Sequence, residues 1–356
     1  MPNIEPYDIV IIGAGPAGSS AALAAARKGL RVLLVERKKA VGIPVRCAEY
    51  IPKALLGELP FSDRSFVVQL VEGMRTILPD GTVRETRAPG LMIRRDWFDH
   101  LLSEAAVQEG AQLLLETRFL GVEDGEVVLK RTNKSFMKIK ARIIIGADGP
   151  WSRVGKYMGS QVRRLVPAVQ VKVALAYPMD HTEVYFDPGI YGGYAWLFPK
   201  GEEANAGLAV VGGTERSIPL RSALEWFLGM LKENGRIKGQ AYGLTAGWLP
   251  VKPVAASVKG NMMLAGDAAG QTHPITGAGV PQAVLCGAMA GAWAARAVAE
   301  DDLGLTKGYE EQWREDYGDT LNWAFRRRRM METNWDRLED IIPKCWVAFR
   351  EYYERS

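Results

Sequence analysis

Apolar and small residues follow one another in a characteristic order at the start of the chain. Residues 7–12 form an apolar run with several β-branched side chains, which predicts a buried strand. Glycines interrupt the run within residues 13–18, and the alanine-rich stretch that continues to Ala26 predicts a helix. A second apolar run, residues 30–35, ends at Glu36. The order strand, glycine loop, helix and strand is typical of a dinucleotide-binding unit.

Further along the chain, alternating and periodic patterns predict more strands and helices. Turn residues at 79–81 divide residues 67–87 into a hairpin, and residues 119–139 form a β-meander. Apolar side chains at helical spacing predict helices at 96–108 and 222–233. Additional strands are expected at residues 113–116, 143–145, 169–176, 181–186, 193–198, 206–211 and 261–265, and helices are expected after residues 279 and 305.

These elements predict an α/β fold made of two domains and a tail. Three separated segments, 1–65, 90–165 and 255–300, are expected to form one discontinuous Rossmann-like dinucleotide-binding domain. Residues 66–89 and 166–254 are expected to form an inserted antiparallel β-sheet domain, which provides one wall of a substrate cavity. Residues 301–356 are expected to form a helical C-terminal tail, rich in tryptophan and arginine.

Each glycine of the first loop has a separate physical role. Gly13 can adopt the backbone angles of a tight turn, Gly15 lets the main chain approach a pyrophosphate, and Gly18 lets the helix pack closely on the sheet. The free amides at the helix start point toward the anion. The carboxylate of Glu36 can accept hydrogen bonds from both ribose hydroxyls of an adenosine, and it would repel a 2′-phosphate.

Composition and charge narrow the class of protein. With 356 residues, of which 47% are apolar, the chain can bury a sizeable core, and a net charge of +4 does not suggest a nucleic-acid binder. Three cysteines make no disulfide framework and lack metal-ligand spacing, so we expect no metal and a cytoplasmic setting. Residues 9–26 and 268–295 are free of charges, but glycine loops, proline and polar residues interrupt them, so we interpret both as buried segments rather than membrane spans.

Three dinucleotide-type signatures together favour a flavin over a nicotinamide. Residues 13–18, 146–149 and 266–267 are similar to the glycine loop, Asp-Gly and Gly-Asp motifs of FAD enzymes that resemble p-hydroxybenzoate hydroxylase. The resemblance implies an extended FAD, with its pyrophosphate at Gly15 and its ribityl chain at Asp267. The FAD-binding residues implied in this way, or favoured by their place in the loops, are Gly13, Gly15, Pro16, Ala17, Gly18, Glu36, Arg37, Arg46, Arg95, Asp148, Gly266, Asp267, Gly277 and Gly279.

Three members of this set have a plain structural alternative. Arg95 matches the arginine of an Arg-x-x-Phe-Asp motif that touches the flavin, but a salt bridge at a helix start is the alternative. Gly277 and Gly279 open a helix whose amides can face the N1/O2 edge of the flavin ring, or they can merely permit close packing.

Two further stretches resemble the geranylgeranyl reductase family. Residues 194–199, Tyr-Ala-Trp-Leu-Phe-Pro, and Gly207 are similar to one motif of that family, and residues 44–49, Pro-Val-Arg-Cys-Ala-Glu, are similar to its cysteine loop. The chain departs from the two motifs at Ala209 and Ala48, and the resemblance covers about residues 7–299. It implies that reduced FAD saturates isolated carbon–carbon double bonds of a prenyl chain, with Cys47 as acid or positioning group. The implied substrate-binding residues are Tyr194, Trp196, Phe198, Pro199 and Gly207.

Several alternatives stay open at this point. Tyr194, Trp196 and Phe198 alternate and would share one face of a strand, where they could line a slot or fill a core, and Cys47 could be a packing residue. An FAD-dependent monooxygenase or halogenase is the first rival function, and a non-catalytic electron-transfer or lipid-binding flavoprotein is the second. The electron donor could be NAD(P)H or reduced ferredoxin. The substrate is expected to be a hydrophobic isoprenoid or lipid.

The tail contains four consecutive arginines, residues 326–329, close to two tryptophans. Such a segment can rest on anionic lipid, which would suit a peripheral membrane association and a lipid substrate. A solvated helix face is the alternative.

Overall fold

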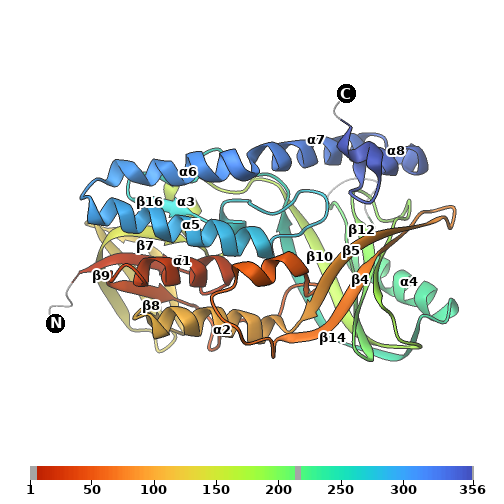
Figure 1. The fold of residues 1–356 in the computed structure, drawn as a ribbon, viewed down its shortest axis with the longest axis horizontal. Coiled ribbons are helices and arrows are strands. Elements are labelled where there is room, and N and C mark those ends of the chain that lie inside the picture. Colours follow the sequence, from red (N-terminus) through yellow and green to blue (C-terminus); the bar gives the residue numbers. More distant parts are fainter. Residues whose placement is uncertain (1–5, 213–217, 355–356) are drawn as a thin grey trace.

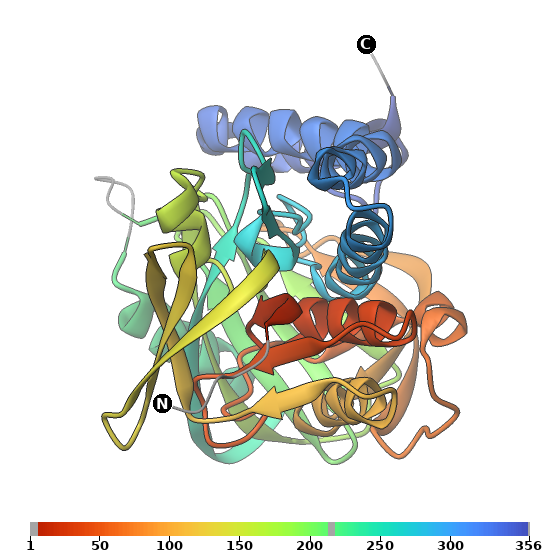
Figure 2. The ribbon, with the colours of Figure 1, turned by 90° about the vertical axis from the view of Figure 1, so that its left-hand side faces the viewer.

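The protein is described by a computed structural model over residues 6–212 and 218–354. Two eight-stranded sheets lie side by side, and a row of C-terminal helices runs along the top of both (Figure 1). The turned view of Figure 2 shows these helices as a separate layer above the rest of the chain. Residues 213–217, which fall inside the range expected for the second domain, lie outside the described residues.

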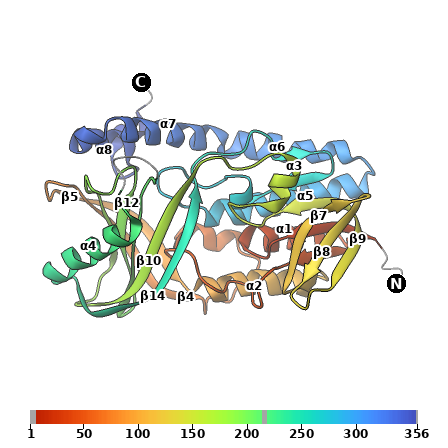
Figure 3. The same ribbon diagram turned by 180° about the vertical axis from the view of Figure 1, so that it is seen from behind.

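The first sheet has the parallel centre expected for a dinucleotide-binding domain. Its strand order is β15-β16-β9-β1-β2-β6, and all neighbours from β16 to β6 are parallel. The β-meander extends β9 outward and closes one end of the molecule (Figure 3). The strands are β1 (Tyr7–Ile12), β2 (Val32–Val35), β6 (Gln112–Leu114), β7 (Thr117–Glu123), β8 (Glu126–Arg131), β9 (Phe136–Gly146), β15 (Val258–Lys259) and β16 (Met262–Leu264).

Helices cover this sheet, and small residues allow two of them to touch. Helix α1 packs between α2 and α5, and α5 crosses α1 at Gly287 and Gly291. A Cβ on either glycine would lie 2.2 Å from a carbonyl oxygen of α1, so only glycine permits this crossing. The bounds are α1 (Pro16–Ala26), α2 (Arg95–Gln108), α3 (Arg153–Met158) and α5 (Val280–Ala299).

The second sheet differs from the expected antiparallel sheet at one place. Its order is β14-β10-β13-β12-β11-β4-β5-β3, and the pair β4–β11 is parallel, with His181 opposite Gly73. A parallel pair needs a long connection, and strands β6, β7, β8 and β9 of the first sheet lie between these two strands in the sequence. The elements are β3 (Tyr50–Pro52), β4 (Val67–Ile77), β5 (Val83–Ile93), β10 (Leu165–Leu175), β11 (His181–Tyr185), β12 (Tyr194–Lys200), β13 (Glu203–Ala209), β14 (Ile237–Pro250) and α4 (Leu220–Glu233).

The tail is helical, as predicted, but its arginines are not all solvated. Arg327 and Arg328 are buried, and Arg327 stacks on Trp323 while its Nη2 donates to the carbonyl oxygens of Glu351 and Glu354. Only Arg326 and Arg329 of the four are exposed, and contact of the tail with anionic lipid stays a prediction. None of the helices within the described residues is long and apolar enough to cross a bilayer. The tail helices are α6 (Lys307–Trp313), α7 (Asp319–Thr333) and α8 (Leu338–Cys345), with a π-helical segment at Arg314–Gly318.

Candidate active site

Three distant segments meet at the carboxyl ends of β1, β9 and β16. Ile12, Gly146 and Leu264 lie next to one another in the sheet, so the residues that follow them share one edge. A Cβ on Gly13 would lie 2.3 Å from the carbonyl oxygen of Ala147, and a Cβ on Gly266 would lie 2.9 Å from the Cβ of Ala17. The three sequence signatures therefore form a single site.

The first loop has the shape that a pyrophosphate requires. Gly13 has a φ of +104°, and a Cβ on Gly18 would lie 1.8 Å from the carbonyl oxygen of Gly13, so the turn and the helix start are locked together. A Cβ on Gly15, by contrast, would meet no atom within 4 Å. The amides of the first turn of α1, which begins at Pro16 and Ala17, face this open side.

Glu36, directly after β2, is hydrogen-bonded to the glycine loop. Its Oε2 accepts the Ala14 N–H at 3.0 Å, and its Oε1 accepts the Lys38 N–H at 2.9 Å. Each carboxylate oxygen retains a lone pair for a ribose hydroxyl. Arg37, which follows, is exposed.

Asp267 and the start of α5 form the opposite wall. The Thr272 hydroxyl donates to Oδ1 of Asp267 at 2.5 Å, and burial raises the pKa of the Asp267 carboxyl. A Cβ on Gly279 would lie 2.8 Å from Oγ1 of Thr272 and 3.4 Å from Oδ1 of Asp267, so glycine is needed for the helix to start here. Gly277 has a φ of +67° in the preceding turn. A carboxylate, open loop amides and a helix start are the donors and acceptors that FAD needs, so these residues fit the cofactor.

Asp148 forms hydrogen bonds to the start of α3. Its Oδ1 accepts the Ser152 hydroxyl at 2.5 Å and its Oδ2 accepts the Arg153 N–H at 2.6 Å, so it holds the start of α3. Burial raises the pKa of this carboxyl. Contact between Asp148 and FAD stays a prediction.

Arg95 forms the salt bridge that was its structural alternative. Its Nε and Nη2 donate to the two carboxylate oxygens of Asp99 at 3.0 and 3.1 Å, one turn along α2. Burial alone would lower the pKa of Arg95, but the Asp99 carboxylate and the nearby Cys47 raise it overall. The positive charge of Arg95 also acts to lower the pKa of Asp267, against the larger effect of burial. A direct flavin contact stays a prediction.

The cysteine loop is held by the second sheet. Gln170 Nε2 donates to the carbonyl oxygen of Cys47 at 2.8 Å, and Asn205 Nδ2 donates to that of Ala48 at 3.1 Å. The N–H of Glu49 donates to Sγ of Cys47 at 3.2 Å. Arg46 is exposed and reaches Gly247 of β14. Cys47 itself is half-buried, whereas Cys286 and Cys345 are buried packing residues, as expected.

Glu49, which the sequence analysis quoted without giving it a role, joins four elements. Its Oε1 accepts the backbone N–H of Arg95 at 3.0 Å, and its Oε2 accepts Lys200 Nζ at 2.6 Å and Asn205 Nδ2 at 3.0 Å. Glu49 is buried and has a φ of +68°, which a glutamate rarely adopts. Its carboxylate therefore fixes the cysteine loop to the start of α2 and to the second sheet.

We expect Glu49→Ala to lower the free energy of unfolding of the FAD-free protein by about 3–5 kcal/mol, because it leaves Lys200 buried without its carboxylate. Urea unfolding measures the loss. Glu109→Ala, which removes an exposed partner of Arg27, is the control and should lower it by less than about 1 kcal/mol. Equal losses in the two variants would show that Glu49 does not hold the loop.

Three aromatic side chains share one face of β12, as their alternation predicts. The ring centroids of Tyr194 and Trp196 lie 6.0 Å apart, and those of Trp196 and Phe198 lie 6.5 Å apart. Pro199 has the opposite parity and lies on the other face of the strand, so it does not join them. The Tyr194 hydroxyl donates to the carbonyl oxygen of Thr276 at 2.5 Å, which ties the aromatic face to the loop before α5.

Gly207 makes room for the indole of Trp196. The two residues are partners across β12 and β13, and a Cβ on Gly207 would lie 2.5 Å from Cζ2 of Trp196 and 2.5 Å from the carbonyl oxygen of Val169. Nε1 of Trp196 is buried and has no hydrogen-bond partner within the described chain.

Gly207→Ala is therefore expected to force the indole away from the sheet and to lower the free energy of unfolding by about 1–3 kcal/mol. Thermal or urea unfolding tests this, with Gly57→Ala as the control, because a Cβ on Gly57 would meet no atom within 4 Å. If the two variants are equally stable, the indole does not depend on this glycine.

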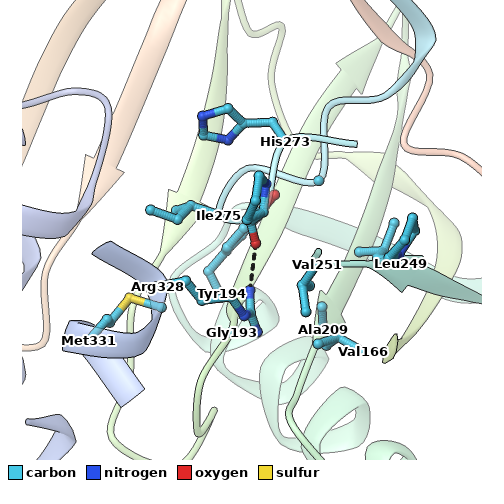
Figure 4. A pocket seen from close by; sticks show the side chains of 13 residues that line it. Val166, Gly193, Tyr194, Ala209, Leu249, Val251, His273, Ile275, Arg328 and Met331 are labelled. Atoms are coloured by element: carbon cyan, nitrogen blue, oxygen red, sulfur yellow. Dashed lines mark hydrogen bonds between the residues drawn. The ribbon is translucent and has the colours of Figure 1, made fainter. Parts of the chain in front are cut away.

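The tail supplies site residues that the sequence analysis missed. Trp346 donates from Nε1 to the Thr76 hydroxyl at 2.9 Å and stacks edge-on against Tyr194, at 5.1 Å between centroids. Arg328 donates to the carbonyl oxygens of Pro274 at 2.8 Å and Gly192 at 2.6 Å, beside an apolar pocket that also contains Tyr194 and Ile275 (Figure 4). The abundance of tryptophan in the tail was the only feature of the sequence that indicated these contacts of Trp346 and Arg328 with the site.

Comparison with known proteins agrees with this geometry. A family model described as FAD dependent oxidoreductase matches residues 8–149. Digeranylgeranylglycerophospholipid reductase 1 of Methanopyrus kandleri is 36% identical over 89% of this chain and 88% of the relative. Digeranylgeranylglycerophospholipid reductase 3 of Methanosphaera stadtmanae is 33% identical over 90% of this chain and 83% of the relative. The chain belongs to the digeranylgeranylglycerophospholipid reductase family. As a member of this family it is an FAD-dependent enzyme.

Two solved structures share the fold of this chain. A geranylgeranyl bacteriochlorophyll reductase-like protein of Thermoplasma acidophilum superimposes with a TM-score of 0.85 at 29% identity, over 97% of this chain and 92% of that one. A flavin-dependent brominase superimposes with a TM-score of 0.74 at 18% identity, over 97% of this chain and 96% of that one, which shows a shared fold.

Proposed function

We propose that this chain saturates isolated carbon–carbon double bonds in the geranylgeranyl-type chains of a lipid. Its relatives are named digeranylgeranylglycerophospholipid reductases. One observation carries the proposal: Tyr194, on the aromatic face, is hydrogen-bonded to the loop that opens α5. Because that loop belongs to the edge that fits FAD, a prenyl chain held on the aromatic face would lie against the flavin.

Bound at this edge in its reduced form, FAD would supply the hydride for one carbon of the double bond. The chain has to provide a proton for the other carbon, and Cys47 is the residue that we propose for this step. Its S–H bond breaks as the new C–H bond forms, and the thiolate that remains is reprotonated from water. The hydrogen bonds of Gln170 and Glu49 hold the loop and the sulfur in place during this transfer.

Water has to be kept away from the reacting atoms, because an isolated double bond has no polar group to attract a proton selectively. The tail does this work in the proposed mechanism. Trp346 of the tail packs against Tyr194, as Phe186 does from the end of β11, and Tyr352 of the tail contacts Nε2 of His273 at 3.3 Å. Burial lowers the pKa of His273 to about 4, so this residue is neutral under ordinary conditions and is not the acid that we propose.

The test is an anaerobic incubation of the FAD-loaded, dithionite-reduced protein with prenyl lipids, followed by mass spectrometry of the products. Added hydrogen pairs in the lipid support the proposal. An unchanged lipid together with a normal flavin spectrum would indicate an electron-transfer or lipid-binding flavoprotein. Oxygen consumption that depends on the substrate, with an oxygenated or halogenated product, would indicate a monooxygenase or halogenase.

A further inference from the structure

A tyrosine of the C-terminal tail lies at the edge of the first sheet that fits FAD. Tyr309 belongs to α6, which packs against α5 (Figure 1), and its side chain is fully buried. Its hydroxyl donates to the carbonyl oxygen of Leu264, the last residue of β16, at 2.8 Å. It also accepts a hydrogen bond from Nε2 of Gln271 at 3.0 Å. Burial raises the pKa of this hydroxyl, so Tyr309 keeps the proton that it donates.

Gln271 connects Tyr309 to the Gly-Asp turn, residues 266–267. Its Oε1 accepts the N–H of Gly266 at 2.7 Å, and its own N–H donates to the carbonyl oxygen of Gly266 at 3.1 Å. Thr272, the next residue, donates to the carboxylate of Asp267. Two neighbouring residues therefore fix the backbone and the side chain of the turn, and the first of them is held by the tail.

Tyr309 determines which way the side-chain amide of Gln271 points. The amide has a donating NH2 group and an accepting oxygen, and rotation exchanges their places. The single hydrogen of the Tyr309 hydroxyl is used on Leu264, so toward Gln271 the hydroxyl can only accept. Nε2 of Gln271 must therefore face Tyr309, which leaves Oε1 for the N–H of Gly266. Gln271 is 1% exposed, so it has little contact with bulk water that could replace the hydroxyl.

We propose that Tyr309 is a positioning residue for FAD: it orients Gln271, which holds the Gly-Asp turn in the conformation that FAD binds. The C-terminal tail is then part of the FAD site as well as a cover for the aromatic face. A turn that is held before the cofactor arrives loses less conformational freedom on binding, so the hydroxyl raises the affinity for FAD. The inference needs FAD as the cofactor, but it does not depend on the proposed reduction of a double bond.

The first test replaces Tyr309 by phenylalanine, which keeps the ring and its packing and removes the hydroxyl. The FAD-free protein is titrated with FAD, and the change in flavin fluorescence gives the Kd. We expect the Kd of Tyr309→Phe to be about tenfold higher than that of the unaltered protein, because the turn is then ordered only when FAD binds. An unchanged Kd would overturn the inference.

Tyr7→Phe is the matched control. The Tyr7 hydroxyl also bonds to a glutamine, Oε1 of Gln112 at 2.6 Å, but Tyr7 is the first residue of β1, at the opposite end of the strand from the glycine loop. This variant loses the same group from the same kind of ring and should bind FAD with an unchanged Kd. Urea unfolding shows that both FAD-free variants are folded at the temperature of the titration. An equal rise of the Kd in both variants would indicate a general loss of stability and would contradict the inference.

A double-mutant cycle tests whether Tyr309 acts through Gln271. Gln271→Met removes the amide, keeps a side chain of similar length and should weaken FAD binding by itself. The double variant should bind FAD about as weakly as Gln271→Met alone, because the hydroxyl then has no amide to orient. If the two effects on the Kd multiply, Tyr309 acts by another route and the inference is wrong.

A measurement on the unaltered protein does not require any variant to fold. Coupling between two sites is reciprocal, so FAD bound at the turn should hold α6 more firmly. Hydrogen exchange followed by mass spectrometry, with and without FAD, should show a larger slowing in α6 than in α4, which packs on the second sheet. Equal slowing in the two helices would show that the tail is not coupled to the FAD site.

Discussion

Replacing Cys47 by alanine is expected to lower turnover of a prenyl substrate by about 10²–10⁴-fold, the usual contribution of a well-placed general acid. An isolated double bond carries no group that an enzyme can polarise, so the second carbon depends on a positioned proton donor. The backbone of the cysteine loop is held by Gln170 and Asn205 through carbonyl oxygens, so removal of the thiol leaves the loop in place. Anaerobic turnover, normalised to the FAD content measured by visible absorption, gives the result.

Two further variants make this prediction specific. Cys47→Ser should also be slow, because a serine hydroxyl is a much weaker acid than a thiol. Cys286→Ala should keep its turnover, because Cys286 is buried in α5, where burial raises the pKa of its thiol to about 12. Full turnover in both Cys47 variants would remove the thiol from the mechanism.

Gly15→Ala is expected to abolish tight FAD binding without weakening the FAD-free protein. Gly15 has an extended conformation, with φ −75° and ψ −175°, that alanine adopts freely, and a Cβ there would meet no atom within 4 Å. The added methyl group would instead stand where the main chain has to approach the pyrophosphate. We expect the Kd for FAD to rise about 100-fold, which corresponds to roughly 3 kcal/mol.

Gly18→Ala serves as the contrasting variant. Its Cβ would lie 1.8 Å from the carbonyl oxygen of Gly13, so it should lower both the stability of the FAD-free protein and its affinity for FAD. Urea unfolding and titration with FAD separate the two effects. Unchanged FAD affinity in Gly15→Ala would show that the pyrophosphate does not lie at this residue.

The loops that fit FAD could be predicted because local sequence determines them. Gly13, Gly18 and Gly266 lie where a Cβ would collide with backbone or with a neighbouring small residue, and such positions exclude other residue types whatever the rest of the fold does. The hairpin around residues 79–81 and the alternating face of β12 were predictable for the same reason. Turn chemistry and strand alternation are short-range properties.

The features that could not be predicted depend on contacts between residues far apart in the sequence. Nothing near Glu49 indicates that Lys200 and Asn205 will reach its carboxylate, and nothing in a run of four arginines indicates which two will be buried against Trp323 and backbone carbonyl oxygens. The parallel pairing of β4 with β11 likewise joins segments that are separated in the sequence by strands β6 to β9 of the first sheet. Pro199 was assigned to the site because it completes the motif that carries the resemblance, although strand alternation places it on the other face.

The crossing of α1 and α5 has a consequence for how the protein is made. Gly287 and Gly291 cover the alanine-rich surface of α1, yet they leave the ribosome long after α1 does. Until then the nascent chain presents an uncovered apolar helix, and the edge that fits FAD lacks Asp267 and the start of α5. The edge that fits FAD is therefore complete only late in synthesis, and until then the exposed apolar residues of α1 make the growing chain prone to aggregation.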